Sequence, residues 1–296
     1  MRLVLTLLAA TGMLLAGCAS SEPDGEAPGR SSSRAAQHNP ALPRPDEPIS
    51  RDPARLADDL AEATAALHEA IDRWRREGDT RARTPREVTL HALHQQRMHL
   101  VLTSRPNLAR MVIPRLPTDL ARDVRTTITA RRALARLAPP VPRRRFRPGP
   151  ALPAGVLLDH YRAAERRFKV AWSVLAAVNF VESAFGRVRN ESVAGAQGPM
   201  QFIRPTWEAY GMGGDVRDPR DAIMGAANYL HASGAPGDYA RALYAYNPSR
   251  LYVTAVLAYA RRMARDVRAY FAYHSWQVFV RTPSGIRRIT GPGFRW

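Results

Sequence analysis

The stretch Pro139–Pro150 constrains the fold most, because it interrupts the chain with residues that a helix does not accept. It holds five prolines and four arginines within twelve positions. Proline lacks the N–H group that a helix needs and clashes with the preceding turn, and neighbouring arginines repel one another. We expect a solvated linker here, with a basic patch that docks on an anionic polymer as the alternative. Helical patterns precede and follow the linker, which predicts two helical parts, 51–138 and 151–272, that fold separately.

The charge of the chain is strongly positive. Lys and Arg number 44 against 26 Asp and Glu, giving a net charge of +18, and Lys169 is the only lysine. Such a balance suits a polyanionic partner, whether nucleic acid, anionic lipid headgroups or an acidic polymer of the cell envelope. The hydrophobic fraction of 45% excludes wholesale disorder. Because Cys18 is the only cysteine, a disulfide scaffold and a multi-cysteine metal site are excluded too.

The first residues predict export. Arg2 precedes an apolar run from Leu3 to Leu15 that is short for a membrane span, and Ala16-Gly17-Cys18 follows at once. This pattern resembles the bacterial lipoprotein signal, in which the mature chain begins at a lipid-modified cysteine; a buried core cysteine is the alternative. We therefore expect a signal peptide at 1–17, lipidation of Cys18, and anchoring on the extracytoplasmic side of a bacterial membrane. Export argues against nucleic acid as the partner.

Residues 18–50 are predicted to form a disordered tether, because they are rich in Ser, Pro and Gly and have little to bury. The part 51–138 then shows helical periodicity, with Leu56, Leu60 and Trp74 on one face and Gly78 at the end. A second helix is expected after Thr84-Pro85, with Thr84 as its N-cap, and a third after Thr118. These three helices form a predicted bundle without a catalytic motif.

Three histidines of the second predicted helix are candidate metal ligands: His91, His94 and His99. They lack a carboxylate or cysteine at ligand spacing, so we expect a solvated helix face and no metal or other cofactor.

The candidate catalytic and binding residues all come after the linker. An apolar helix is expected from Val170 to Ala184, and Glu182 stands near its end. An apolar environment disfavours the charged form of a carboxyl group, so its pKa rises and it can hold a proton near neutral pH. Glu182 is thus a candidate general acid, with a structural carboxylate at a helix end as the alternative.

Three further blocks follow Glu182. The first is glycine-rich, runs from Ser192 to Phe202, and allows close approach of a ligand to the backbone. The second is Tyr229-Leu230, and the third is Tyr246-Asn247 before Pro248. Taken singly, these blocks fit a tight loop, a core aromatic residue and a helix end.

Taken together, Glu182-Ser183, Gly-Ala-x-Gly-x-Met-Gln, Tyr-Leu and Tyr-Asn resemble the soluble lytic transglycosylase domain of the goose-type lysozyme superfamily. The resemblance covers roughly 155–270. It implies that Glu182 is catalytic. It also implies substrate contacts for seven residues: Ser192, Met200, Gln201, Phe202, Tyr229, Tyr246 and Asn247. Two departures, Pro199 in place of a common leucine and Pro248-Ser249 in place of Ala-Gly, affect the flanking subsites rather than the reaction.

The resemblance implies cleavage of peptidoglycan glycan strands between N-acetylmuramic acid and N-acetylglucosamine, with formation of a 1,6-anhydro ring. Ordinary glycosidases use a second carboxylate, and no second acidic residue stands at a motif position. Alternatives are a hydrolytic muramidase of the same fold, a peptidoglycan-binding lipoprotein without activity, and a polyanion binder at the membrane surface.

The end of the chain completes the predicted fold. A helix is expected from about Leu251 to Arg268, and the tail 273–296 alternates around a Pro-Ser-Gly turn, which predicts a β-hairpin packed on the helices. The expected fold class is mainly α: a lysozyme-like helical catalytic domain, preceded by a small helical bundle and followed by a short hairpin.

Overall fold

The computed structural model describes residues 42–137, 146–283 and 285–294. The signal peptide, Cys18 and most of the predicted tether lie outside these residues. Residues 42–50 are described, and they lie against the helices that follow. Arg97 donates a hydrogen bond to the carbonyl oxygen of Glu47, 2.5 Å away, and Ile49 packs on an apolar cluster. The chain is therefore packed before residue 50 is reached.

The part before the linker contains four α-helices and a short 3-10 helix. They are α1 (Pro53–Glu77), α2 (Arg86–Ser104), α3 (Pro106–Val112), η1 (Ile113–Arg115) and α4 (Thr118–Leu137). The Asp52 side chain accepts a hydrogen bond from the N–H of Arg55 at 2.8 Å and caps α1, which ends before Gly78. The bundle thus contains one α-helix more than predicted, namely α3. The N-cap of α2 is Pro85 rather than Thr84.

The part after the linker is helical up to a two-stranded antiparallel hairpin. Its elements are α5 (Ala154–Phe168), α6 (Trp172–Ser183), α7 (Arg204–Tyr210), α8 (Pro219–Ala232), α9 (Tyr239–Tyr246), α10 (Arg250–Arg265), α11 (Val267–Ser275), β1 (Phe279–Thr282) and β2 (Gly285–Arg288). The mainly α fold class and the hairpin are confirmed. The single helix expected over 251–268 is wrong. Asp266 has extended backbone, ends α10 and caps α11 by accepting the N–H of Arg268.

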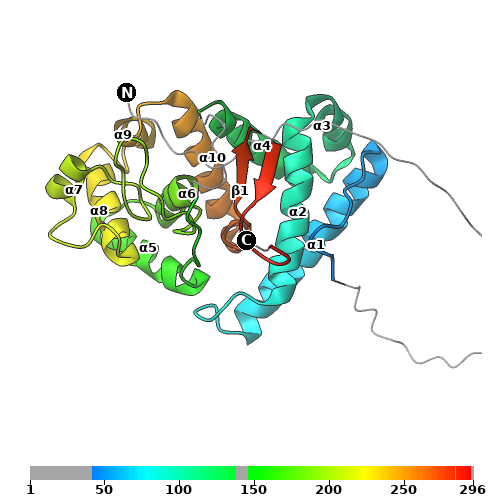
Figure 1. The fold of residues 1–296 in the computed structure, drawn as a ribbon, viewed down its shortest axis with the longest axis horizontal. Coiled ribbons are helices and arrows are strands. Elements are labelled where there is room, and N and C mark those ends of the chain that lie inside the picture. Colours follow the sequence, from blue (N-terminus) through cyan, green and yellow to red (C-terminus); the bar gives the residue numbers. More distant parts are fainter. Residues whose placement is uncertain (1–41, 138–145, 284, 295–296) are drawn as a thin grey trace, which may run out of the picture.

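One hydrophobic core crosses the predicted boundary between the two parts. Leu67 and Trp74 of α1 and Leu134 of α4 share a cluster with residues of α5 to α11. Figure 1 shows α1 to α4 on one side of the molecule and α5 to α9 on the other, with α10 between them. Helix α10 packs on both α4 and α6. The domain boundaries stay predictions, but separate folding of the two parts does not fit this shared core.

The hairpin is held by an apolar patch and by a reciprocal pair of hydrogen bonds. Val280 and Ile289 are buried with Phe146 and Val188. The Gln96 side chain donates to the Gln277 carbonyl oxygen at 2.7 Å and accepts the Gln277 N–H at 2.8 Å. The hairpin therefore packs on the loops that hold Phe146 and Val188, and the segment just before β1 is bonded to α2.

The histidine face of α2 is not solvated as predicted. His91 and His99 are buried and His94 is half-buried, and burial lowers the pKa of His99 to about 3. His99 lies against Trp276, with the ring centroids 5.6 Å apart, so its part of α2 packs on the chain after the linker. Glu69 of α1 lies near His91, and Glu47 lies near His94. None of the helices in the described ranges combines the length and apolarity needed to span a membrane.

Candidate functional site

Glu182 lies in the last turn of α6, a helix whose every residue from Ser173 to Ser183 is buried. The residue is 6% exposed. Burial raises the pKa of its carboxyl group from an ordinary 4.5 to about 7, which is the direction expected from the apolar sequence of the helix. A carboxyl group with this pKa can both donate and accept a proton near neutral pH, as general acid–base chemistry requires.

Tyr252 on α10 opposes this rise. Its hydroxyl lies near the Glu182 carboxyl group without reaching regular hydrogen-bond geometry, and the interaction lowers the pKa of Glu182 in part. Tyr252 is fully buried, and burial together with the Glu182 charge raises its own pKa well above the ordinary value. No sequence pattern indicated Tyr252, which belongs to none of the four blocks.

Ser183 ties the glycine-rich block to the end of α6. Its hydroxyl donates a hydrogen bond to the Pro199 carbonyl oxygen at 2.6 Å and accepts the Gly186 N–H at 2.8 Å. Ala184, Phe185 and Gly186 all have positive φ, so the chain turns sharply after the helix. The residue after Glu182 therefore positions the loop, a role that no sequence pattern indicated.

The glycine-rich block is a loop closed on itself. The Ser192 hydroxyl accepts the N–H groups of Ala194 and Ala196 at 3.2 and 3.0 Å. Gln197 and Phe202 exchange two backbone hydrogen bonds of 2.9 Å. A Cβ atom at Gly198 would lie 1.8 Å from the Val216 carbonyl oxygen, so only glycine fits there.

The Gln201 side chain of this loop makes only part of its possible hydrogen bonds. Its amide nitrogen donates to the carbonyl oxygens of Gly198 and Asn190 at 3.0 and 3.2 Å. Its buried Oε1 atom has no hydrogen-bond partner among the described residues. A buried acceptor without a partner is costly unless a ligand or water supplies the donor.

The aromatic residues of the predicted site meet beside this loop. The Tyr246 hydroxyl donates to the Met200 carbonyl oxygen at 2.6 Å. Its ring lies 5.6 Å from that of Tyr229 and 5.8 Å from that of Phe202. Burial raises the pKa of Tyr246 well above its ordinary value, and the nearby charge of Glu182 adds to the rise. The structure thus brings Met200, Phe202, Tyr229 and Tyr246 together, and Tyr246 lies near the Glu182 carboxyl group.

A family comparison agrees with this geometry. Residues 159–268 match the family model described as the transglycosylase SLT domain. The match is consistent with a soluble lytic transglycosylase domain, and we call residues 159–268 the transglycosylase domain. Such domains act on peptidoglycan by lytic transglycosylase-type cleavage, so peptidoglycan is the substrate class that the match supports. Comparisons with curated proteins and with solved structures returned no match.

Asn247 and Ser192 are the two remaining predicted site residues. Buried Asn247 ends α9, its N–H donating to the Leu243 carbonyl oxygen at 2.9 Å. Ser192 lines a cavity of about 1080 Å³ with Arg147, Arg189 and Arg217, and Glu182 does not line this cavity. Within the described ranges, no set of three or more His, Cys, Asp or Glu side chains is arranged to hold a metal ion.

Proposed function

We propose that this protein is a peptidoglycan lytic transglycosylase that cleaves the β-1,4 bond between N-acetylmuramic acid and N-acetylglucosamine without water. The observation that carries the proposal is the buried carboxyl group of Glu182, whose pKa is raised to about 7 beside the glycine-rich loop of a transglycosylase domain. Glu182 in its acid form would protonate the glycosidic oxygen. The substrate's acetamido oxygen would stabilise the positive charge that develops at the anomeric carbon.

The same glutamate would then act as a base. Having given up its proton, the Glu182 carboxylate accepts the proton of the muramoyl 6-hydroxyl group, whose oxygen attacks the anomeric carbon and closes the 1,6-anhydro ring. No second carboxylate is needed. Burial and Tyr252 account for the pKa shift of Glu182, without a carboxylate neighbour among the described residues. The acidic residues of the adjoining loop and helices are occupied elsewhere: Glu191 pairs with Arg217, Glu208 with Arg204, and Asp218 caps α8.

The predicted substrate-binding residues divide by exposure. Tyr229 and Gln201 are half-buried, and the unsatisfied Gln201 Oε1 atom supports a direct contact with sugar. Met200, Phe202 and Tyr246 are buried and hydrogen-bonded or packed together, so we assign them the support of the cleft wall. Ser192 and Asn247 are proposed to shape the loop and the end of α9.

The test is mass spectrometry of the products from purified glycan strands. Anhydro-muramoyl ends, one water lighter than reducing ends, are expected from the native protein, whereas reducing ends would indicate the muramidase alternative. Glu182→Gln should remain folded and lose about 10²–10⁴-fold in turnover, the usual contribution of general acid catalysis. Binding of strands without any cleavage by the native protein would instead favour the non-catalytic peptidoglycan-binding lipoprotein or the polyanion binder. Ordinary turnover by folded Glu182→Gln would contradict the assignment.

We further propose that the protein is lipid-anchored through Cys18 on the extracytoplasmic side of a bacterial membrane. The support is the short apolar run that ends in Leu15-Ala16-Gly17-Cys18. An acyl chain contributes about 0.8 kcal/mol per buried methylene, so several chains anchor a protein stably. Cys18→Ala should accumulate as an uncleaved precursor or leave the membrane fraction. Recovery of a processed Cys18→Ala protein in carbonate-washed membranes would exclude the anchor.

A further inference from the structure

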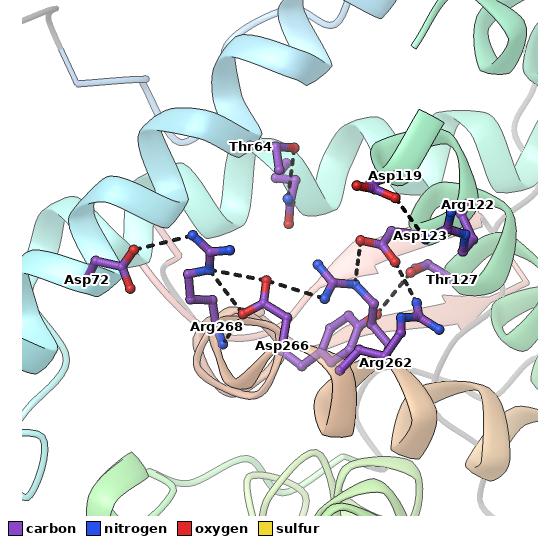
Figure 2. Close-up of polar contacts among 12 residues, drawn as sticks. Thr64, Asp72, Asp119, Arg122, Asp123, Thr127, Arg262, Asp266 and Arg268 are labelled. Atoms are coloured by element: carbon purple, nitrogen blue, oxygen red, sulfur yellow. Dashed lines mark hydrogen bonds and ion pairs between the residues drawn. The ribbon is translucent and has the colours of Figure 1, made fainter. Parts of the chain in front are cut away.

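A chain of ion pairs joins the helices before the linker to those of the transglycosylase domain (Figure 2). Asp123 of α4 forms ion pairs with Arg262 at 2.9 Å and with Arg265 at 2.7 Å, both on α10. Arg262 also lies 3.6 Å from Asp266, at the junction of α10 and α11. Asp266 pairs in turn with Arg268, which reaches Asp72 of α1 at 3.3 Å. We call these six residues the α10 clamp.

The centre of the α10 clamp is shielded from water. The Arg262 side chain is 9% exposed and that of Asp123 is 22% exposed. By contrast, the Asp119–Arg122 pair one turn earlier on α4 has exposures of 86% and 55% and contacts no other helix through this pair. Exposed pairs contribute little, whereas removing one partner of a shielded pair leaves an uncompensated charge. The clamp therefore constrains how α10 lies on α4.

A buried hydroxyl pair continues the connection toward the catalytic helix. Thr127 of α4 and Tyr273 of α11 share a hydrogen bond of 2.9 Å. The Tyr273 ring stacks on Phe180 of α6 at 5.4 Å, and the Tyr259 ring of α10 meets Phe180 edge-on at 4.9 Å. Phe180 stands two residues before Glu182. Helix α10 is thus held between α4 and the catalytic end of α6.

The face of α10 that meets α6 also carries Tyr252. Tyr252 and Tyr259 are seven residues apart, which places them on one face of a helix, and Arg262 follows Tyr259 by three residues. A rotation or slide of α10 as a rigid rod would therefore move the Tyr252 hydroxyl relative to the Glu182 carboxyl group. Burial around that carboxyl group leaves little room for a substitute partner.

Resting on the proposed function, we propose that Asp123 and Arg262 are positioning residues of the transglycosylase reaction. They fix the rotation and register of α10 on α4, and through α10 they hold Tyr252 beside Glu182. The helices before the linker are then part of the catalytic unit rather than an accessory bundle.

The test is a double-mutant cycle in the full chain, with kcat and KM measured on soluble glycan strands. Asp123→Asn should lower kcat by about ten- to a hundredfold, the size of effect expected when a reacting group is slightly misplaced, and leave KM nearly unchanged. In a Tyr252→Phe background, Asp123→Asn should have almost no further effect, because the contact through which it acts is already lost. The matched control Asp119→Asn removes the exposed carboxylate of the same helix and should leave kcat unchanged.

A purely structural role predicts a different result. The proposal would be overturned if Asp123→Asn lowered kcat by the same factor in the native background as in the Tyr252→Phe background. It would also be overturned if Asp123→Asn left kcat unchanged while circular dichroism showed a native fold.

Hydrogen exchange gives a readout that does not depend on activity. Asp123→Asn should speed amide exchange in α10 and at the end of α6, whereas exchange in α8 and in the Asp119→Asn control should match the native protein. If the native protein showed no turnover at all, the proposed function would fail, and unchanged exchange in α10 would independently overturn the clamp.

Discussion

At the residue scale, the proposed chemistry rests on one carboxyl group that the fold keeps out of water. The pKa of Glu182 is raised because its charged form is poorly solvated. The folded protein therefore binds a proton that the unfolded chain releases between about pH 4.5 and about pH 7. Linkage then requires that stability fall as pH rises through this interval, since the folded state holds more protons.

This linkage predicts the behaviour of Glu182→Gln, which keeps the shape and has no charge to bury. Below pH 4.5 the native protein and the variant should differ little in their free energy of unfolding, because the glutamate is protonated in both states. Toward pH 7 and above, the variant should become the more stable of the two. Urea unfolding across a pH series measures the difference, and Glu208→Gln, at an exposed position of α7, is the control. If the difference in free energy of unfolding did not change with pH, the Glu182 carboxyl group would have to be well solvated in the folded state.

At the element scale, α10 joins the helices before the linker to those of the proposed site, and the residues at its two ends determine where the helix begins and stops. The Ser249 side chain accepts the Tyr252 N–H at 3.4 Å and caps the start. Asp266 ends the helix and begins α11, so the two axes can diverge. Continuous periodicity over 251–268 predicted one helix because the pattern of apolar residues carries through the break. The break brings Arg268 to Asp72 and lets α11 cover Phe180 with Tyr273.

At the scale of the whole molecule, the shared core changes the expected behaviour of a truncated protein. A fragment that starts near Ala151 would expose the apolar surfaces of α10 and α11 that α1, α2 and α4 cover. It would also leave Arg262 without Asp123. The linker alone predicts that the part after it folds independently. Because of the shared core, we predict instead that this part does not fold stably without α1 to α4.

The fragment 151–296 should show reduced helicity, a broad unfolding transition and no turnover even on soluble strands, because burying too little apolar surface leaves a domain only marginally stable. Circular dichroism and thermal unfolding measure this. The control is a chain that starts at residue 42, just before the packed segment, and it should fold like the full protein. A cooperative transition of native amplitude in the fragment 151–296 would mean that the transglycosylase domain carries a sufficient core of its own.

Local patterns in the chain were enough to predict the mainly α fold class, the helices α1, α2, α4, α6 and most of α10, the hairpin and the candidate acid. Each of these depends on neighbours within a few turns: the period of apolar residues, prolines and glycines at helix ends, and an apolar run around Glu182. The four blocks that resemble the lytic transglycosylase family predicted which residues belong to the site. What local patterns do not contain is the identity of partners far along the chain. Helix packing placed Tyr252 beside Glu182, bound Asp123 to Arg262 and buried two of the α2 histidines. No local pattern could predict these contacts, because packing depends on the complementary shape and charge of surfaces that are distant in sequence.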